Sequence, residues 1–193
     1  NKGNSLLNLR KINFSNYGYK KNLIDGEVFG KNFKINLKDN LSNIYFKILK
    51  TGVSFNLNIL EGNLPKLVKG TFKGQVLKSK FKINFSYDTK NIKIEDLFFR
   101  DESLSFNSKG NILLKPFFKI NLTSEIQHIE NKLIKNLNLN RILKQRELIR
   151  RINSKNNFTF KSKKFSRNTI DSLVLNTNLA FGRLNFEKNL KIS

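Results

Sequence analysis

The chain has 193 residues and a formal net charge of +23, and it contains no cysteine, methionine or tryptophan. The absence of cysteine excludes disulfides, thiol catalysis and thiolate metal sites. No apolar run approaches the ~20 residues of a spanning helix and no signal-like N-terminus is present, so these residues are expected to be soluble or peripheral. Because the sequence does not begin with methionine, we expect it to be a fragment of a longer chain.

The first 60 residues alternate apolar and polar side chains in short runs, which is typical of half-buried strands. These runs cover residues 9–14, 23–29, 33–37, 44–48 and 53–59. Turn-forming residues such as Thr51 and Gly52 separate them, so neighbouring runs are expected to form antiparallel hairpins. Residues 61–70 contain Pro65 and predict one irregular link.

Residues 70–122 repeat the same alternation most regularly and form the centre of the predicted sheet. Phe81, Ile83, Phe85 and Tyr87 alternate with Lys82, Asn84 and Ser86, which puts the apolar groups on one face. The pattern continues in Ile92 and Ile94, Leu104 and Phe106, Ile112 and Leu114, and Phe118, Ile120 and Leu122. Short polar breaks between these runs predict a meander of antiparallel strands.

The period changes between about residues 125 and 153, where apolar residues recur at spacings of three and four. This spacing predicts one or two amphipathic helices, inserted in the β structure rather than forming a second domain. Four cations on their polar side are candidates for binding anionic lipid headgroups: Lys144, Arg146, Arg150 and Arg151. The same residues also fit a solvated helix face. Alternation resumes at residues 158–160, 170–179 and 184–192.

The expected fold is therefore mainly β, an elongated and twisted antiparallel sheet of ten or more strands. Residues 1–193 form a single module with the helical insert near residues 125–153. The period-two strands fit either an open groove, with one face lined by apolar side chains, or a closed core.

Residues suited to covalent chemistry are few. His128 is the single histidine, and we place it as a polar residue at the entry to the predicted helix. The paired acids Glu95-Asp96 and Asp101-Glu102 are read as strand ends that flank Arg100 rather than as an acid/base pair. Because no nucleophile–base pairing, metal-ligand spacing or phosphate loop can be assembled, we expect neither an enzyme nor a bound metal or cofactor.

The high positive charge has two interpretations. It can mark a polyanionic partner, either nucleic acid or an anionic membrane surface. It can also reflect an AT-rich genome, whose codons favour lysine, asparagine, isoleucine and phenylalanine. Lysines occur in nearly every predicted strand, as solvated faces require, and we favour this second interpretation.

The order of segments resembles the C-terminal repeat region of AsmA-like proteins of Gram-negative bacteria. The resemblance rests on the Gly-Thr-Phe-Lys-Gly segment at 70–74, the strands at 81–87 and 92–99, and the short segments at 104–106, 110–112 and 116–118. It continues through a helix at 148–153 and strands at 158–163 and 170–184 with their Gly182-Arg183-Leu184 ending, and it covers roughly residues 9–192. The residue bias is similar to that of such a protein from an AT-rich alphaproteobacterium.

This resemblance implies a β-groove in the periplasm, anchored to the inner membrane by a segment outside this chain. It also implies a non-enzymatic role in outer-membrane biogenesis through phospholipid transport between membranes, with acyl chains in the groove. The candidate groove residues are Phe72, Phe81, Ile83, Phe85, Tyr87, Ile92, Ile94, Leu104, Phe106, Ile112, Leu114, Phe118 and Ile120. The alternative is a basic module for nucleic acid or an anionic surface, with these residues sealed in a core and the lysines on one surface.

Overall fold

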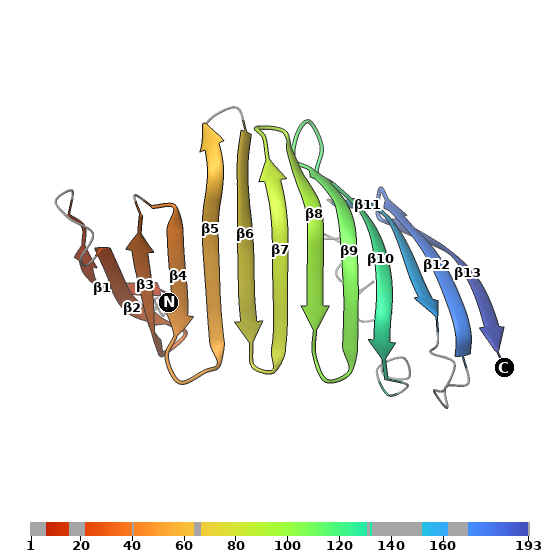
Figure 1. Ribbon diagram of the computed structural model, residues 1–193, viewed down its shortest axis with the longest axis horizontal. Helices are drawn as coiled ribbons and strands as arrows, with labels where there is room; N and C mark the ends of the chain where they lie inside the picture. Colours follow the sequence, from red (N-terminus) through yellow and green to blue (C-terminus); the bar gives the residue numbers. More distant parts are fainter. Residues whose placement is uncertain are drawn as a thin grey trace, which may run out of the picture.

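A computed structural model describes residues 7–15, 22–39, 41–63, 67–130, 132, 152–161 and 170–192. Thirteen strands form one sheet, in which the order across the sheet is the order along the chain (Figure 1). The strands are β1 (Leu7–Asn13), β2 (Asn22–Val28), β3 (Lys31–Lys38), β4 (Asn43–Ile48), β5 (Val53–Asn63), β6 (Leu67–Val76), β7 (Ser79–Tyr87), β8 (Asn91–Arg100), β9 (Leu104–Leu113), β10 (Lys119–Ile129), β11 (Asn153–Lys161), β12 (Ile170–Ala180) and β13 (Arg183–Ile192). The predicted mainly antiparallel, twisted sheet is confirmed.

The sheet is open, because β1 and β13 each have a single neighbour among the described strands. All adjacent pairs are antiparallel except β10 and β11, which run parallel. A parallel pair needs a long crossover connection, and the chain places residues 130–152 between these two strands. The sequence pattern did not predict this parallel pair.

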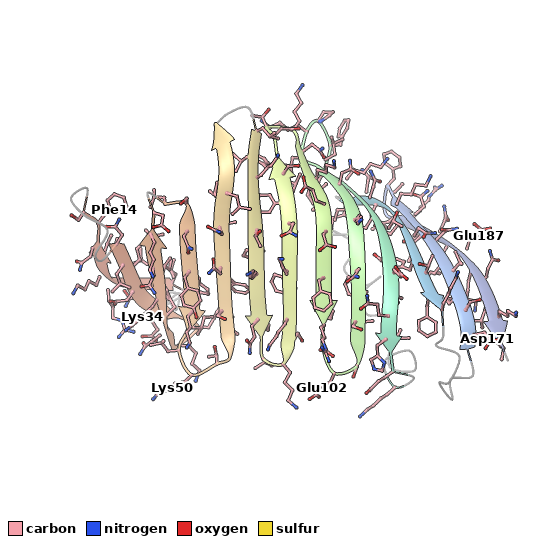
Figure 2. The ribbon with its side chains drawn as sticks, in the orientation of Figure 1. Phe14, Lys34, Lys50, Glu102, Asp171 and Glu187 are labelled. Atoms are coloured by element: carbon pink, nitrogen blue, oxygen red, sulfur yellow. The ribbon has the colours of Figure 1, made fainter. Side chains whose placement is uncertain are left out.

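The alternating sequence gives the sheet two chemically different faces. We call the face that carries Phe46, Phe55, Phe81, Phe99 and Phe106 the apolar face, since cross-strand pairing places these residues on the same side. The opposite side, which we call the polar face, carries mainly lysine, asparagine, serine and threonine. Figure 2 shows the side chains of the described residues on this single layer of strands.

Few side chains are fully buried in this single layer. The buried apolar residues of the described chain are Phe33, Val68, Ile94 and Phe160, with exposed fractions of 3 to 7%. The other large side chains of the central apolar face are half-buried. Apolar residues of the two edge strands are more open, with Leu9 51% and Phe186 62% exposed. The apolar face of the described residues is therefore not a sealed core.

The predicted helical insert is wrong for its first five residues, because Glu125 to Ile129 continue β10. The pairing of β10 with β9 shifts by one residue between Ile126 and His128. This extra residue separates Ile126 from Ile129 by three positions, and that spacing mimics a helical period. His128 thus lies in a strand, opposite Ser105, rather than at a helix entry. Lys132 is helical, and the rest of the predicted insert lies outside the described residues except Glu130, Ile152 and Asn153.

Two shorter expectations also need correction. Strand β5 runs to Asn63 and β6 begins at Leu67, so most of the predicted irregular link between residues 61 and 70 is sheet. Glu95 and Asp96 do not end a strand, since they lie inside β8 where its pairing shifts between Ile94 and Leu97. Such shifts let a strand accommodate a pair of polar residues without breaking the apolar face.

Candidate functional site

Phenylalanine rings form a nearly continuous ladder across the apolar face from β3 to β7. Their centroids are 5.8 Å apart for Phe33–Phe46 and for Phe46–Phe55, and 5.9 Å apart for Phe55–Phe72. Phe81 closes the ladder at 5.5 Å from Phe72 and 6.1 Å from Phe55. Aromatic pairs at these distances attract beyond the area they bury, so the ladder stabilises the sheet.

Glycines on β6 make room for the rings of β7. Gly74 pairs with Phe81 and Gly70 pairs with Phe85. A Cβ atom at Gly74 would lie 2.1 Å from the Phe81 ring, and one at Gly70 would lie 2.8 Å from a backbone oxygen of Asn58. The ring of each phenylalanine therefore covers the backbone of its glycine partner, which explains the spacing of the two glycines.

Most of the sequence-predicted groove residues meet on the apolar face. Cross-strand register joins Phe72 to Ile83 and Phe85 to Ile94, and it joins Phe81 to Phe106 through Phe99. A second row runs from Tyr87 through Ile92 and Ile112 to Ile120. Leu104 pairs with Ile129 at the end of β10.

Leu114 and Phe118 lie outside the strands, in the link between β9 and β10. Leu114 is half-buried and its backbone N–H donates to the carbonyl oxygen of Lys90 at 2.7 Å. Phe118 is 39% exposed, and its carbonyl oxygen accepts a hydrogen bond from the Asn153 N–H at 3.4 Å. These two groove candidates therefore lie beyond the end of β9 and before the start of β10, and not in the paired part of the sheet.

The apolar face is larger than the predicted set of residues. It begins before residue 70, with Phe33, Phe46 and Phe55, and it includes Phe99 on β8. Beyond β10 it continues through Phe158 and Leu175. The same two-residue alternation that identified the central strands marks these residues too, so the signal was present in the sequence and only its extent was underestimated.

A pair of serines interrupts the apolar face at its centre. Ser108 and Ser124 are directly opposite each other on β9 and β10, and each is 2% exposed. Their hydroxyl oxygens lie 2.6 Å apart, so one donates a hydrogen bond to the other. This pairing satisfies two polar groups that burial would otherwise destabilise.

A hollow on the described surface lies over β9–β13 and is lined mainly by polar-face side chains. It has a volume of about 670 Å³. On its floor Asn157 donates to the side chain of Asn176 at 2.6 Å, and Asn176 donates to the carboxylate of Glu187 at 3.3 Å. These side chains thus form a chain of hydrogen bonds across β11, β12 and β13.

The described residues contain no cluster of three or more histidine or acidic residues that could hold a metal ion. His128 is exposed at the end of β10.

The Asp101 carboxylate has a lowered pKa, first because it accepts a hydrogen bond from the Ser103 N–H, and also because it accepts one from the Ser79 hydroxyl. The Lys78 pKa is raised by its hydrogen bond and ion pair with Glu102 at 2.7 Å.

Both perturbed groups lie at turns at one end of the sheet. The headgroup candidates Lys144, Arg146, Arg150 and Arg151 lie outside the described residues. Within the described residues, no helix is long and apolar enough to cross a bilayer.

Comparisons with models of protein families, with curated proteins and with solved structures give no significant match. The two faces of the sheet therefore carry the evidence for function.

Proposed function

We propose that the apolar face binds the acyl chains of phospholipids, and that the chain is a β-groove module of an AsmA-like protein. In this proposal it is a non-enzymatic part of a periplasmic conduit, anchored to the inner membrane by a segment outside this chain. Its role is phospholipid transport between membranes during outer-membrane biogenesis. The observation that carries the proposal is a stripe of mostly half-buried apolar side chains, which among the described residues crosses the strands in register from β3 to β12.

Physical chemistry supports an apolar occupant for this stripe. Each methylene group removed from water contributes about 0.8 kcal/mol to the free energy of binding. Many such contributions would add up for an acyl chain lying along the half-buried phenylalanines. Such contacts are not directional, and a chain could slide from one ring to the next. A row of rings about 4.8 Å from strand to strand suits that movement better than a single closed pocket.

The stripe also includes a narrow polar point at Ser108 and Ser124. Because the two hydroxyls bond to each other, and each serine is only 2% exposed, neither hydroxyl is left unsatisfied on this face. The conduit therefore needs no charged side chain on this face between β7 and β10, and the register places none there.

Photo-crosslinking tests the proposal at neighbouring residues on opposite faces. A benzophenone amino acid at Phe85 or Phe106 is expected to crosslink phospholipid in cells, because both side chains lie on the apolar face. The matched controls are Asn84 and Asn107, one position away on the polar face, and they should give little lipid adduct. Equal lipid labelling at all four positions, or labelling of the two asparagines alone, would contradict the proposal.

Nucleic-acid binding is the second candidate, and the position of the lysines favours it. Lys47, Lys73, Lys80 and Lys82 all lie on the polar face, as a polyanion-binding sheet would require. The same hypothesis expected the phenylalanines in a sealed core, whereas they are half-buried. A titration with single-stranded DNA separates the candidates, since binding by such lysines must weaken steeply as salt rises.

A further inference from the structure

A separate hollow on the polar face, over β4–β8, combines lysines with aromatic rings. Its volume is about 340 Å³, and its lining includes Tyr45, Lys73, Lys80, Lys82 and Phe98. An adjoining hollow of about 170 Å³ shares Lys73 and Lys82. The two lysines therefore stand at the centre of one concave region.

One row of residues crosses the hollow on five strands. Tyr45 on β4 pairs with Asn56 on β5, which pairs with Lys73 on β6. Lys73 pairs in turn with Lys82 on β7, and Lys82 pairs with Phe98 on β8. The row thus has an aromatic ring at each end, about 19 Å apart by strand spacing, and two ammonium groups between them.

Among the described residues, no acidic side chain forms an ion pair with the lysines of this row. Like charges directly opposite each other on neighbouring strands destabilise a sheet, and Lys80 opposite Arg100 repeats the arrangement two residues away. Within the described residues, Lys73, Lys80 and Lys82 form no ion pair or hydrogen bond. Asp96, the acidic residue of this face on β8, is diagonal to Lys82 and forms no ion pair with it.

We propose that this hollow binds a small soluble ligand that carries two or more phosphate groups. Phosphate oxygens would bridge the opposed cations and remove their repulsion, through the charge-assisted hydrogen bonds that lysine forms with phosphate. The rings of Tyr45 and Phe98 supply flanking apolar surfaces, and the volume lies in the range of small-molecule sites.

This ligand is not the cargo of the proposed conduit. The hollow is on the polar face, so a phospholipid whose acyl chains lie on the apolar face cannot place its headgroup there. The inference therefore stands or fails independently of lipid transport.

Calorimetric titration of the 193-residue chain with sodium pyrophosphate tests the inference. The double variant Lys73→Gln/Lys82→Gln is expected to weaken binding at least about tenfold, since two charge-assisted hydrogen bonds are lost. The matched control is Lys93→Gln/Lys109→Gln, which removes the same charge from the same face but outside the hollow. That control should bind pyrophosphate within about twofold of the unmodified chain, because general attraction is screened by salt.

Three results would overturn the inference. One is an equal loss of pyrophosphate binding in both double variants, which would mean nonspecific attraction. Another is binding to phosphatidic acid vesicles or to a thymidine oligonucleotide without any binding of pyrophosphate, which would assign the face to a membrane or to a nucleic acid. The third is a pyrophosphate affinity equal to that of the unmodified chain in the single variants Lys73→Gln and Lys82→Gln. These single variants keep the test valid if the double variant does not fold.

Discussion

At the scale of single residues, the buried serine pair gives the clearest energetic expectation. Replacing Ser108 with Ala leaves the Ser124 hydroxyl buried without a partner, and such a loss typically costs about 1–3 kcal/mol. Replacing both serines with alanine removes donor and acceptor together, so the double variant should be more stable than the sum of the single changes predicts. Urea unfolding of the two single variants and the double variant measures this coupling. Additive losses would mean that the hydroxyls do not act as a pair.

The stability of the folded chain at low pH is expected to depend on Asp101. The lowered pKa of Asp101 means that its carboxylate stabilises the folded chain above the ordinary value of 3.8, and that this contribution disappears as pH falls through the lowered pKa. The unmodified chain should therefore lose stability below about pH 3.8 more steeply than Asp101→Asn, which has no carboxylate to protonate. Urea midpoints between pH 5 and pH 2.5 give the comparison. Parallel curves for the two proteins would show that the carboxylate contributes nothing.

At the scale of secondary-structure elements, most of the strands could be predicted because the alternation of apolar and polar side chains is nearly unbroken. Strand β7 is an example, since Phe81, Ile83 and Phe85 face one side and Lys82 and Asn84 the other. The same reasoning failed at β10. There the one-residue shift after Ile126 changed the local period from two to three and produced a false helical signal.

Periodicity also says which face a residue occupies but not which strand lies beside it. For this reason the parallel neighbour of β10 could not be predicted, although it determines that Ser124 lies opposite Phe158. The row of Tyr45, Lys73, Lys82 and Phe98 was missed for the same reason. Each residue is unremarkable in its own strand, and only the register of β4–β8 brings the four together.

At the scale of the whole molecule, an open sheet with two unlike faces must keep its ligands apart. Acyl chains are excluded from the lysine-rich face by the cost of leaving ammonium groups without water, and phosphates are excluded from the phenylalanine face for the same reason. If both proposals hold, a single layer of strands separates the acyl chains from the phosphates by about the thickness of one backbone. This separation permits tests in which one face is changed and the other serves as its control.

The last prediction uses that separation for the proposed conduit. An unpaired carboxylate in the path of an acyl chain costs several kcal/mol if the site stays dry, so Phe85→Glu should reduce the transfer of fluorescent phospholipid by more than about tenfold. Asn84→Glu adds the same charge one residue away on the polar face, and it should transfer lipid as the unmodified chain does. His128→Ala should also transfer lipid as the unmodified chain does, because a conduit needs no general base. The measurement is lipid transfer between vesicles, with circular dichroism to show that each variant is folded. If folded Phe85→Glu transfers lipid normally while His128→Ala does not, acyl chains do not travel on the apolar face.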